Sequence, residues 1–181
     1  MTIKELLHDF YQENKIPDQG GYDKKQFQMK AFGLSFMLPN PKFTREVIHI
    51  HDIQHVLNKQ DTSWKGEGFI AGWEISTGMW KHFPLGFLSL WAMGYSLWLY
   101  PKAVYDGYIK GLGDHGIIDL SYTREAFMEM KFDKLKLLTK KNQRPAVGLG
   151  TKLHFLLWFS LSQIVFLSPA LFALLFVLFL W

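Results

Sequence analysis

Two histidines and two carboxylates between residues 51 and 67 have the types and the spacing of metal ligands. His51, Asp52 and His55 lie within about one helical turn, and Glu67 follows His55 after eleven residues. On an α-helix the first three side chains fall within an arc of about 100°. Imidazole nitrogens and carboxylate oxygens suit Zn²⁺ or a similar divalent ion. The predicted metal ligands are therefore His51, Asp52, His55 and Glu67.

Two further observations narrow this donor set. His49 would lie about 200° around the helix from His51, so it is predicted to stay outside the cluster. The chain of 181 residues contains no cysteine, which excludes thiolate ligands and disulfides. Any metal must be bound by imidazole and carboxylate groups.

A helix from Pro41 to about Leu57 is expected to carry the histidines, with Asn40 as its N-cap and Pro41 at its first position. An apolar stripe is predicted to form its buried face, beside the ligands: Phe43, Val47, Ile50 and Leu57.

A second helix, about residues 64–79, is expected to carry Glu67 near its start, with Asp61 or Ser63 as the cap. Because two helices joined by a short loop run antiparallel, this arrangement can bring Glu67 back to the first helix. Glu74 would share a helical face with Glu67 and is a candidate hydrogen-bond partner of the ligands.

The remaining periodicity favours further helices at about residues 3–10, 22–38 and 121–138, with a loop at 17–21. The predicted fold is all-α, a helical bundle domain over residues 1–149 followed by a C-terminal transmembrane helix. Residues 83–100 contain no charge, but Pro84, Gly86 and Gly94 interrupt them, so a buried or lipid-facing helix is favoured over a membrane span.

Residues 153–181 form a run of 29 residues without Asp, Glu, Lys or Arg. As a helix the run is about 43 Å long, enough to cross a bilayer, and a hairpin at Ser168 and Pro169 is the alternative. Seven basic residues and one acid precede it between Lys131 and Lys152. A basic flank of this kind predicts a membrane anchor at 150–181 with the domain on the cytoplasmic side, and it does not require nucleic acid as a partner.

The pattern H-D-x-x-H, eleven residues, then E resembles the metal signature of the Coq-four family of ubiquinone (coenzyme Q) biosynthesis. Residues 65–67 and 73–74 are similar to the continuation of that signature, and the overall resemblance covers roughly residues 10–140. It implies a mostly helical, membrane-associated and metal-dependent protein. The implied activity is that of a decarboxylase, a lyase that oxidatively removes or hydroxylates the ring carboxylate position of a polyprenylated hydroxybenzoate. The C-terminal anchor departs from the family pattern.

Three hypotheses of function follow. In the first, the bound metal, with zinc preferred, polarises a ring oxygen while residues 83–100 hold the prenyl tail of this or another prenyl-lipid. The second is a non-catalytic lipid-binding scaffold with a structural metal, working with other quinone-biosynthesis proteins or as a homodimer. The third is an HD-domain phosphohydrolase, which would need an upstream histidine, either His8 or His49, and one downstream aspartate: Asp106, Asp114 or Asp119.

Overall fold

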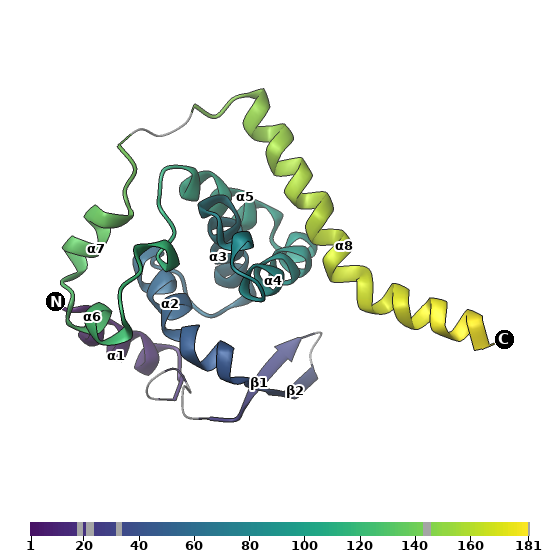
Figure 1. The fold of residues 1–181 in the computed structure, drawn as a ribbon, viewed down its shortest axis with the longest axis horizontal. Helices are drawn as coiled ribbons and strands as arrows, with labels where there is room; N and C mark the ends of the chain where they lie inside the picture. The colour runs from purple at the N-terminus through teal and green to yellow at the C-terminus, as the bar shows by residue number, and fades with distance from the viewer. Residues whose placement is uncertain (18–19, 21–23, 32–33, 143–145, 181) are drawn as a thin grey trace. The chain divides into compact units, whose positions relative to one another are not determined.

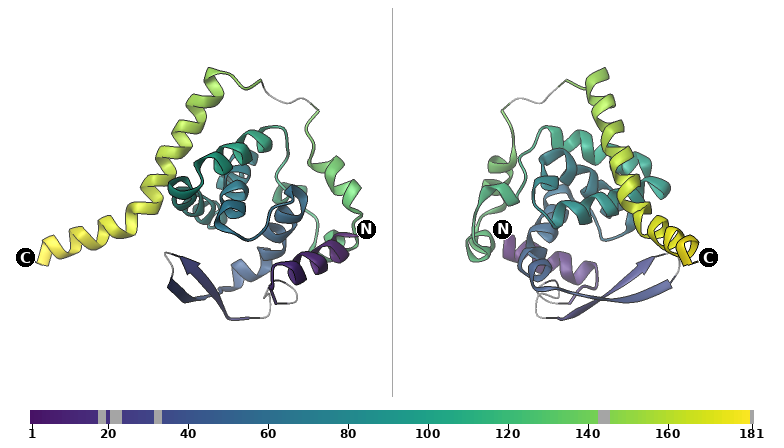
Figure 2. Two further views of the ribbon diagram at one scale, coloured as in Figure 1. Left: turned by 180° about the vertical axis from the view of Figure 1, so that it is seen from behind. Right: turned by 45° about the vertical axis from the view of Figure 1, so that its right-hand side comes forward.

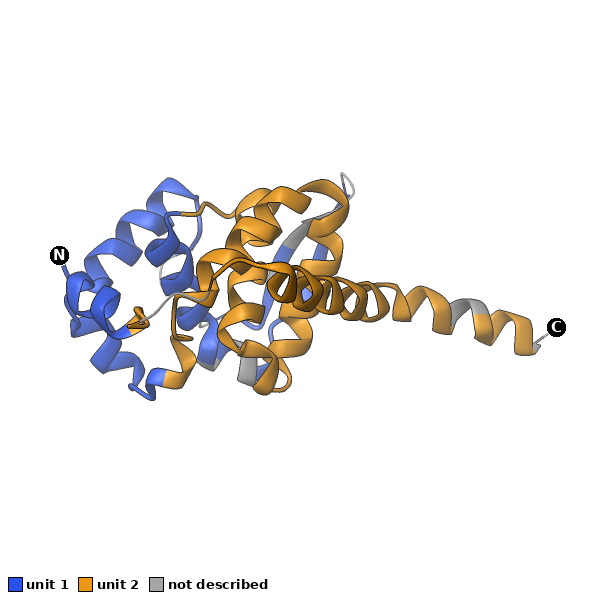
Figure 3. Ribbon diagram, turned by 90° about the horizontal axis from the view of Figure 1, so that it is seen from above, with its two compact units in different colours: residues 1–59, 120–138 blue, residues 60–119, 139–181 orange. Residues whose placement is uncertain are grey.

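The computed structural model describes residues 1–17, 20, 24–31, 34–142 and 146–180, and these are mostly helical. They form two compact units (Figure 3). Unit 1 contains residues 1–59 and 120–138, and unit 2 contains residues 60–119 and 139–181. The expected helical fold with a long apolar C-terminal helix is confirmed. That last helix begins at Leu149 and belongs to unit 2 together with residues 60–119.

Unit 1 begins with helix α1, Ile3–Glu13, as its periodicity predicts. Thr2 and Glu5 form a capping box that satisfies the free N–H groups of the first turn. Ile3, Leu7 and Phe10 are buried on one face of the helix. This face is what fixes α1 in the unit, because an isolated helix of 11 residues is marginal in water.

A β-hairpin replaces the helix that was expected over residues 22–38. Strands β1, Gln26–Ala31, and β2, Leu34–Pro39, pair antiparallel in a register that joins Ala31 to Leu34 and Gln26 to Pro39 (Figure 1). The prediction was wrong because only residues 32 and 33, which are Phe-Gly, separate the strands, and a two-residue link containing glycine is a hairpin signal. Those two positions, and most of the loop expected at 17–21, lie outside the described residues.

Helix α2, Lys42–Asn58, matches the predicted histidine-bearing helix within one residue at each end. Its N-cap is Pro41, whereas Asn40 was expected, and the Asn40 side chain instead donates to the carbonyl of Lys24 at 3.0 Å. The buried face also differs from the predicted apolar stripe, since Val47, Ile50 and Leu57 are only partly buried. The most buried positions of α2 are largely polar: His49, Asp52, Ile53, Gln54 and His55.

Two short helices stand where one helix was expected over residues 121–138. Helix α6 is Arg124–Glu129 and helix α7 is Phe132–Thr139. Met130 between them is extended, with ψ at 137°, and its carbonyl accepts the backbone N–H of Ile3 at 2.9 Å. The helix is therefore interrupted at Met130, where the backbone pairs with the start of α1.

Unit 2 is built around two closely packed helices, α3, Trp64–Thr77, and α5, Pro101–Leu112 (Figure 1). Helix α3 was predicted with Asp61 or Ser63 as its cap, and the cap is Ser63, whose side chain accepts from the N–H of Gly66. Helix α5 was not predicted as a helix. Glycines from both helices form the contact: a Cβ at Gly72 would overlap the carbonyl oxygen of Val104, and one at Gly107 would overlap that of Phe69.

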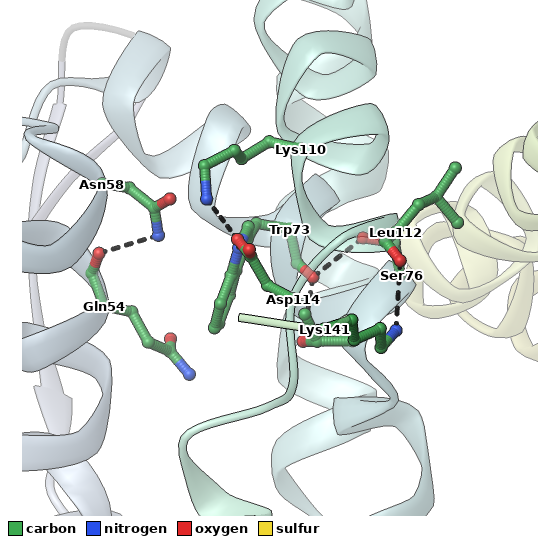
Figure 4. Close-up of polar contacts among 9 residues, drawn as sticks. Gln54, Asn58, Trp73, Ser76, Lys110, Leu112, Asp114 and Lys141 are labelled. Carbon is green, nitrogen blue, oxygen red and sulfur yellow. Dashed lines mark hydrogen bonds and ion pairs between the residues drawn. The ribbon is translucent and has the colours of Figure 1, made fainter. Parts of the chain in front are cut away.

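The order of these contacts shows that α3 and α5 are parallel, since Phe69 meets Gly107 and Trp73 meets Gly111. Two GxxxG patterns, at 68–72 and 107–111, thus let the two backbones approach closely. A buried carboxylate adds a polar tie to this contact (Figure 4). Asp114 accepts from Trp73 Nε1 at 2.9 Å and also pairs with Lys110.

The uncharged helix α4, Leu85–Leu99, and the long helix α8, Leu149–Leu180, complete unit 2, together with the short 3₁₀ helix Met79–Lys81. A second 3₁₀ helix, Ile118–Leu120, spans the point in the sequence where unit 2 gives way to unit 1. The core of the unit joins side chains from α3, α4, α5 and α8: Ala71, Ile75, Met93, Leu97, Val104, Tyr108 and Trp158. Both views in Figure 2 show the C-terminal half of α8 extending away from the other helices of unit 2.

Helix α8 is long and apolar enough to cross a membrane, and only 6% of its most apolar window is buried. At 32 residues it is about 48 Å long. Pro169 interrupts its backbone hydrogen bonds, and α8 changes direction in this part of the helix (Figure 1). Its exposure distinguishes it from the core helix of a soluble protein.

Candidate metal centre

The two predicted histidine ligands are adjacent on one face of α2, one turn apart. His51 and His55 have their Nε2 atoms 3.2 Å apart, and their rings meet edge to face with centroids separated by 4.8 Å. His55 is 1% exposed and packs against the ring of Phe10 at a centroid distance of 5.6 Å. Burial and packing therefore hold this ring in one orientation.

The distance between these nitrogens agrees with metal binding. Two imidazole nitrogens bound to one zinc ion at about 2.0–2.1 Å in a tetrahedral site are separated by about 3.3 Å. The observed separation of 3.2 Å is nearly the same. Two nitrogens so close cannot both carry a proton between them, so at least one Nε2 presents its lone pair. The pair is thus arranged to share a proton or a cation.

Glu67 is the third member of this group. His51, His55 and Glu67 each offer a ligand atom, and these atoms all lie within 4.8 Å of one another, so the group could bind a metal ion. Glu67 lies in the first turn of α3, where the positive end of the helix dipole stabilises a carboxylate. Two nitrogens and a carboxylate oxygen are the His₂Glu donor set of many catalytic zinc sites.

Asp52, the fourth predicted ligand, is not part of this group. It is 7% exposed, and its Oδ2 accepts a hydrogen bond from the Tyr11 hydroxyl at 2.8 Å. Burial of Tyr11, reinforced by the neighbouring Asp52 carboxylate, raises the pKa of this phenol far above its ordinary value. Tyr11 therefore stays protonated at physiological pH and donates to Asp52. Sequence reasoning missed Tyr11, since nothing in the spacing of α1 links it to α2.

Other residues singled out from the sequence lie elsewhere. His49 is buried, with its ring 6.4 Å from that of Phe127, and is not in the metal group, as predicted. Glu74 is 5% exposed and its Oε2 accepts from Ser89 Oγ at 2.6 Å, which ties α3 to α4. This contact gives Glu74 a role in helix packing.

The three aspartates that were candidates for the single downstream ligand of the phosphohydrolase hypothesis are also engaged in other contacts. Asp114 binds Trp73 and Lys110, Asp106 pairs with Lys102, and Asp119 accepts from His82 Nε2 at 2.9 Å when that nitrogen is protonated. None of them belongs to the described metal group. The geometry gives this hypothesis no support.

A cavity of about 450 Å³ lies within unit 1, between α1 and α6, and Tyr11 lines it. The side chains around it carry both signs of charge: Lys4, His8, Arg124, Glu125 and Glu129, beside Leu7 and Met128. Tyr11, which lines this cavity, is also the residue whose hydroxyl donates to Asp52. It is large enough for an aromatic ring with its substituents.

In comparisons with known proteins, no family profile, curated relative or solved structure matches this chain.

Proposed function

We propose that His51, His55 and Glu67 bind one divalent ion, preferably zinc, and that the chain acts at a membrane on a polyprenylated aromatic ring of ubiquinone or related prenyl-lipid synthesis. The observation that carries the metal site is the 3.2 Å separation of the two Nε2 atoms on α2. The substrate class rests on the resemblance of the metal motif to the Coq-four family. Helix α8 agrees with it, because a substrate with a long prenyl tail resides in a bilayer.

The number of ligands separates a catalytic role from a structural one. Three protein ligands leave a fourth position of a tetrahedral site for water or for a substrate oxygen, whereas four close it. A bound ion would supply Lewis acidity that stabilises negative charge on a ring oxygen. In the proposal, Tyr11 holds Asp52 back as a fixed neighbouring charge, and the site keeps its open position. Asp52 as a fourth ligand would favour the non-catalytic scaffold.

The cavity beside Tyr11 is proposed to receive the polar head of the substrate. Lys4 and Arg124 line it, and both can bind a ring carboxylate by charge-assisted hydrogen bonds. Tyr11 supplies an aromatic face and is kept neutral by its burial. The uncharged helix α4 remains the proposed contact for the prenyl tail.

The direct test is metal and lipid analysis of the purified full-length chain in detergent. We expect one zinc per chain by elemental analysis, a co-purifying prenyl-lipid by mass spectrometry, and release of carbon dioxide from a carboxyl-labelled polyprenyl-hydroxybenzoate under air. A chain that binds no zinc at saturating zinc would contradict the metal site. Normal zinc and lipid content without release of carbon dioxide would favour the scaffold.

A further inference from the structure

Helix α4 and the first half of α8 pack closely through small residues. A Cβ added at Gly94 would lie 2.5 Å from the carbonyl oxygen of Ser162 and 2.6 Å from Cβ of Phe166, so glycine is required at this crossing. Tyr95 and Trp91 extend the contact, with ring centroids 5.9 Å and 5.5 Å from that of Phe166. Close approach at a glycine is how helices associate where no hydrophobic effect drives them together.

One side chain of α8 makes this contact specific. Gln163 lies within the uncharged run, and both ends of its amide bind α4: Trp98 Nε1 donates to Oε1 at 2.8 Å, and Nε2 donates to the carbonyl of Gly94 at 3.1 Å. Transfer of an amide without hydrogen-bond partners into hydrocarbon costs free energy, and the two hydrogen bonds to α4 avoid that cost for Gln163. If this part of α8 enters the bilayer, its polar group enters already paired with α4.

The outward side chains of α4 are apolar at both of its ends. Phe87 and Leu88 are 44% and 45% exposed near the start, and Trp98 and Leu99 are 68% and 50% exposed at the end. The α8 residues on the outer side of the same pair are also exposed and apolar, among them Leu156 and Leu157. The apolar surface of the candidate span thus continues onto α4.

We infer that α4 is embedded in the bilayer beside α8, with its exposed side chains against lipid acyl chains. At 15 residues α4 is about 22 Å long, shorter than the hydrocarbon core of about 30 Å, so it enters the membrane without crossing it. The membrane-embedded part of the protein is therefore a pair of helices joined through Gln163 and Gly94. This inference rests on the candidate span and is independent of the proposed catalysis.

The test uses the absence of cysteine, which makes single-cysteine labelling unambiguous. Nitroxide labels are placed at Leu88→Cys and Leu99→Cys on α4 of the full-length chain in phosphatidylcholine vesicles. Phe172→Cys, 71% exposed on α8, serves as the lipid reference. Asp133→Cys, whose side chain is 91% exposed on α7, serves as the aqueous reference. Collision rates with oxygen and with water-soluble chromium oxalate are measured by electron paramagnetic resonance.

We expect both α4 labels to follow the Phe172 label, with oxygen favoured over chromium oxalate by a similar ratio. Labels that instead follow the Asp133 label would overturn the inference, because α4 would then face water. Labels reached by neither reagent would also overturn it, since a second copy or another protein would then cover α4.

The amide contact has its own control. Gln163→Leu removes both interhelical hydrogen bonds, whereas Ser160→Leu changes an exposed residue whose hydroxyl donates to the carbonyl of Leu156 in its own helix. We expect Gln163→Leu, and not Ser160→Leu, to shift the Leu99 label toward chromium oxalate. An equal response of the two variants would overturn the role assigned to Gln163.

Discussion

The hydroxyl of Tyr11 on α1 donates a hydrogen bond to Oδ2 of Asp52 on α2 across 2.8 Å, and both groups are buried. The contact joins residues 41 positions apart and fixes a carboxylate next to the histidine pair. Carboxylates and imidazoles at metal sites are commonly oriented by such hydrogen bonds. The role of Asp52 therefore depends on a residue far from the metal motif in the sequence.

Tyr11→Phe should raise zinc affinity by about tenfold or more, because Asp52 loses the hydrogen bond that holds it back and can then become a fourth ligand. Titration of the purified variant with zinc in competition with a chromogenic chelator measures the change. Tyr122→Phe is the matched control, since Tyr122 is part-exposed and its ring contact with Phe127 survives loss of the hydroxyl. An unchanged affinity in Tyr11→Phe would show that the hydrogen bond from Tyr11 does not keep Asp52 away from the metal.

Substitution of each histidine on α2 separates the ligand pair from its neighbour. His51→Ala and His55→Ala should abolish binding at one zinc per chain, because each removes one nitrogen donor, whereas His49→Ala should retain it. His49 is a stringent control because it too is buried, so its loss disturbs packing to a comparable extent. Elemental analysis after dialysis provides the measurement, with thermal unfolding to check that each variant folds. Equal loss of zinc in His49→Ala would refute the arrangement of the helix face.

The helical face that carries the histidines could be predicted from the sequence because local spacing alone determines it. His51 and His55 are one turn apart on any α-helix, and α2 was predicted within one residue at each end. The capped start of α3, which places Glu67 in its first turn, followed equally from the local signal at Ser63.

The predictions that were wrong concern features that depend on residues distant in the sequence. Asn40 has the residue type and position of an N-cap, but its side-chain amide donates to the carbonyl of Lys24. The helix expected over 121–138 is interrupted where the carbonyl of Met130 accepts from the N–H of Ile3. Tertiary contacts override local propensity in both cases. Helix α5 was missed because its glycines weaken the helical pattern, yet they are the residues that allow it to pack on α3.

Gly72→Ala should destabilise unit 2 by about 1–3 kcal/mol, the range typical of overpacking. The new Cβ would overlap the carbonyl oxygen of Val104, and this backbone atom cannot move aside as a side chain can. The gain of about 1 kcal/mol in helix propensity from glycine to alanine would offset part of the loss. Gly148→Ala is the control, because nothing lies within 4 Å of a Cβ there. Denaturant unfolding in detergent measures both, and equal stabilities would contradict the close α3–α5 contact.

Removal of residues 169–181 should change how the protein is held in membranes. The full-length chain should resist extraction by alkaline carbonate, as expected if α8 crosses the bilayer. The truncated chain keeps Trp158, Ser162 and Gln163, and hence its contacts with α4, but the uncharged part of α8 that remains, residues 153–168, is only about 24 Å long and too short to cross. It should therefore still float with vesicles and yet be extracted by carbonate. A full-length chain that stays soluble without detergent would contradict the anchor.

Glu67→Gln separates an enzyme from a scaffold, because glutamine keeps the shape of the side chain and removes its negative charge. If the metal stabilises charge on the ring in the transition state, the loss of a charged ligand alters that stabilisation most. Interactions made only in the transition state appear in the rate and not in ground-state binding. Product formation should therefore fall about tenfold to a hundredfold, while the prenyl-lipid content of the purified variant stays near that of the parent chain.

The comparison is made in cells at equal protein levels, with quinone or lipid product measured beside the zinc and lipid content of the purified protein. Glu74→Gln is the matched control: Glu74 lies seven residues along the same helix, is buried, and accepts from Ser89, a contact that a glutamine oxygen can also accept. This variant should leave product and zinc content unchanged. Normal product from Glu67→Gln with a zinc-depleted site would refute the catalytic role, because turnover would then proceed without the ion. The membrane-anchored lipid-binding scaffold would be the better account, since such a protein needs only its fold and its place in the bilayer.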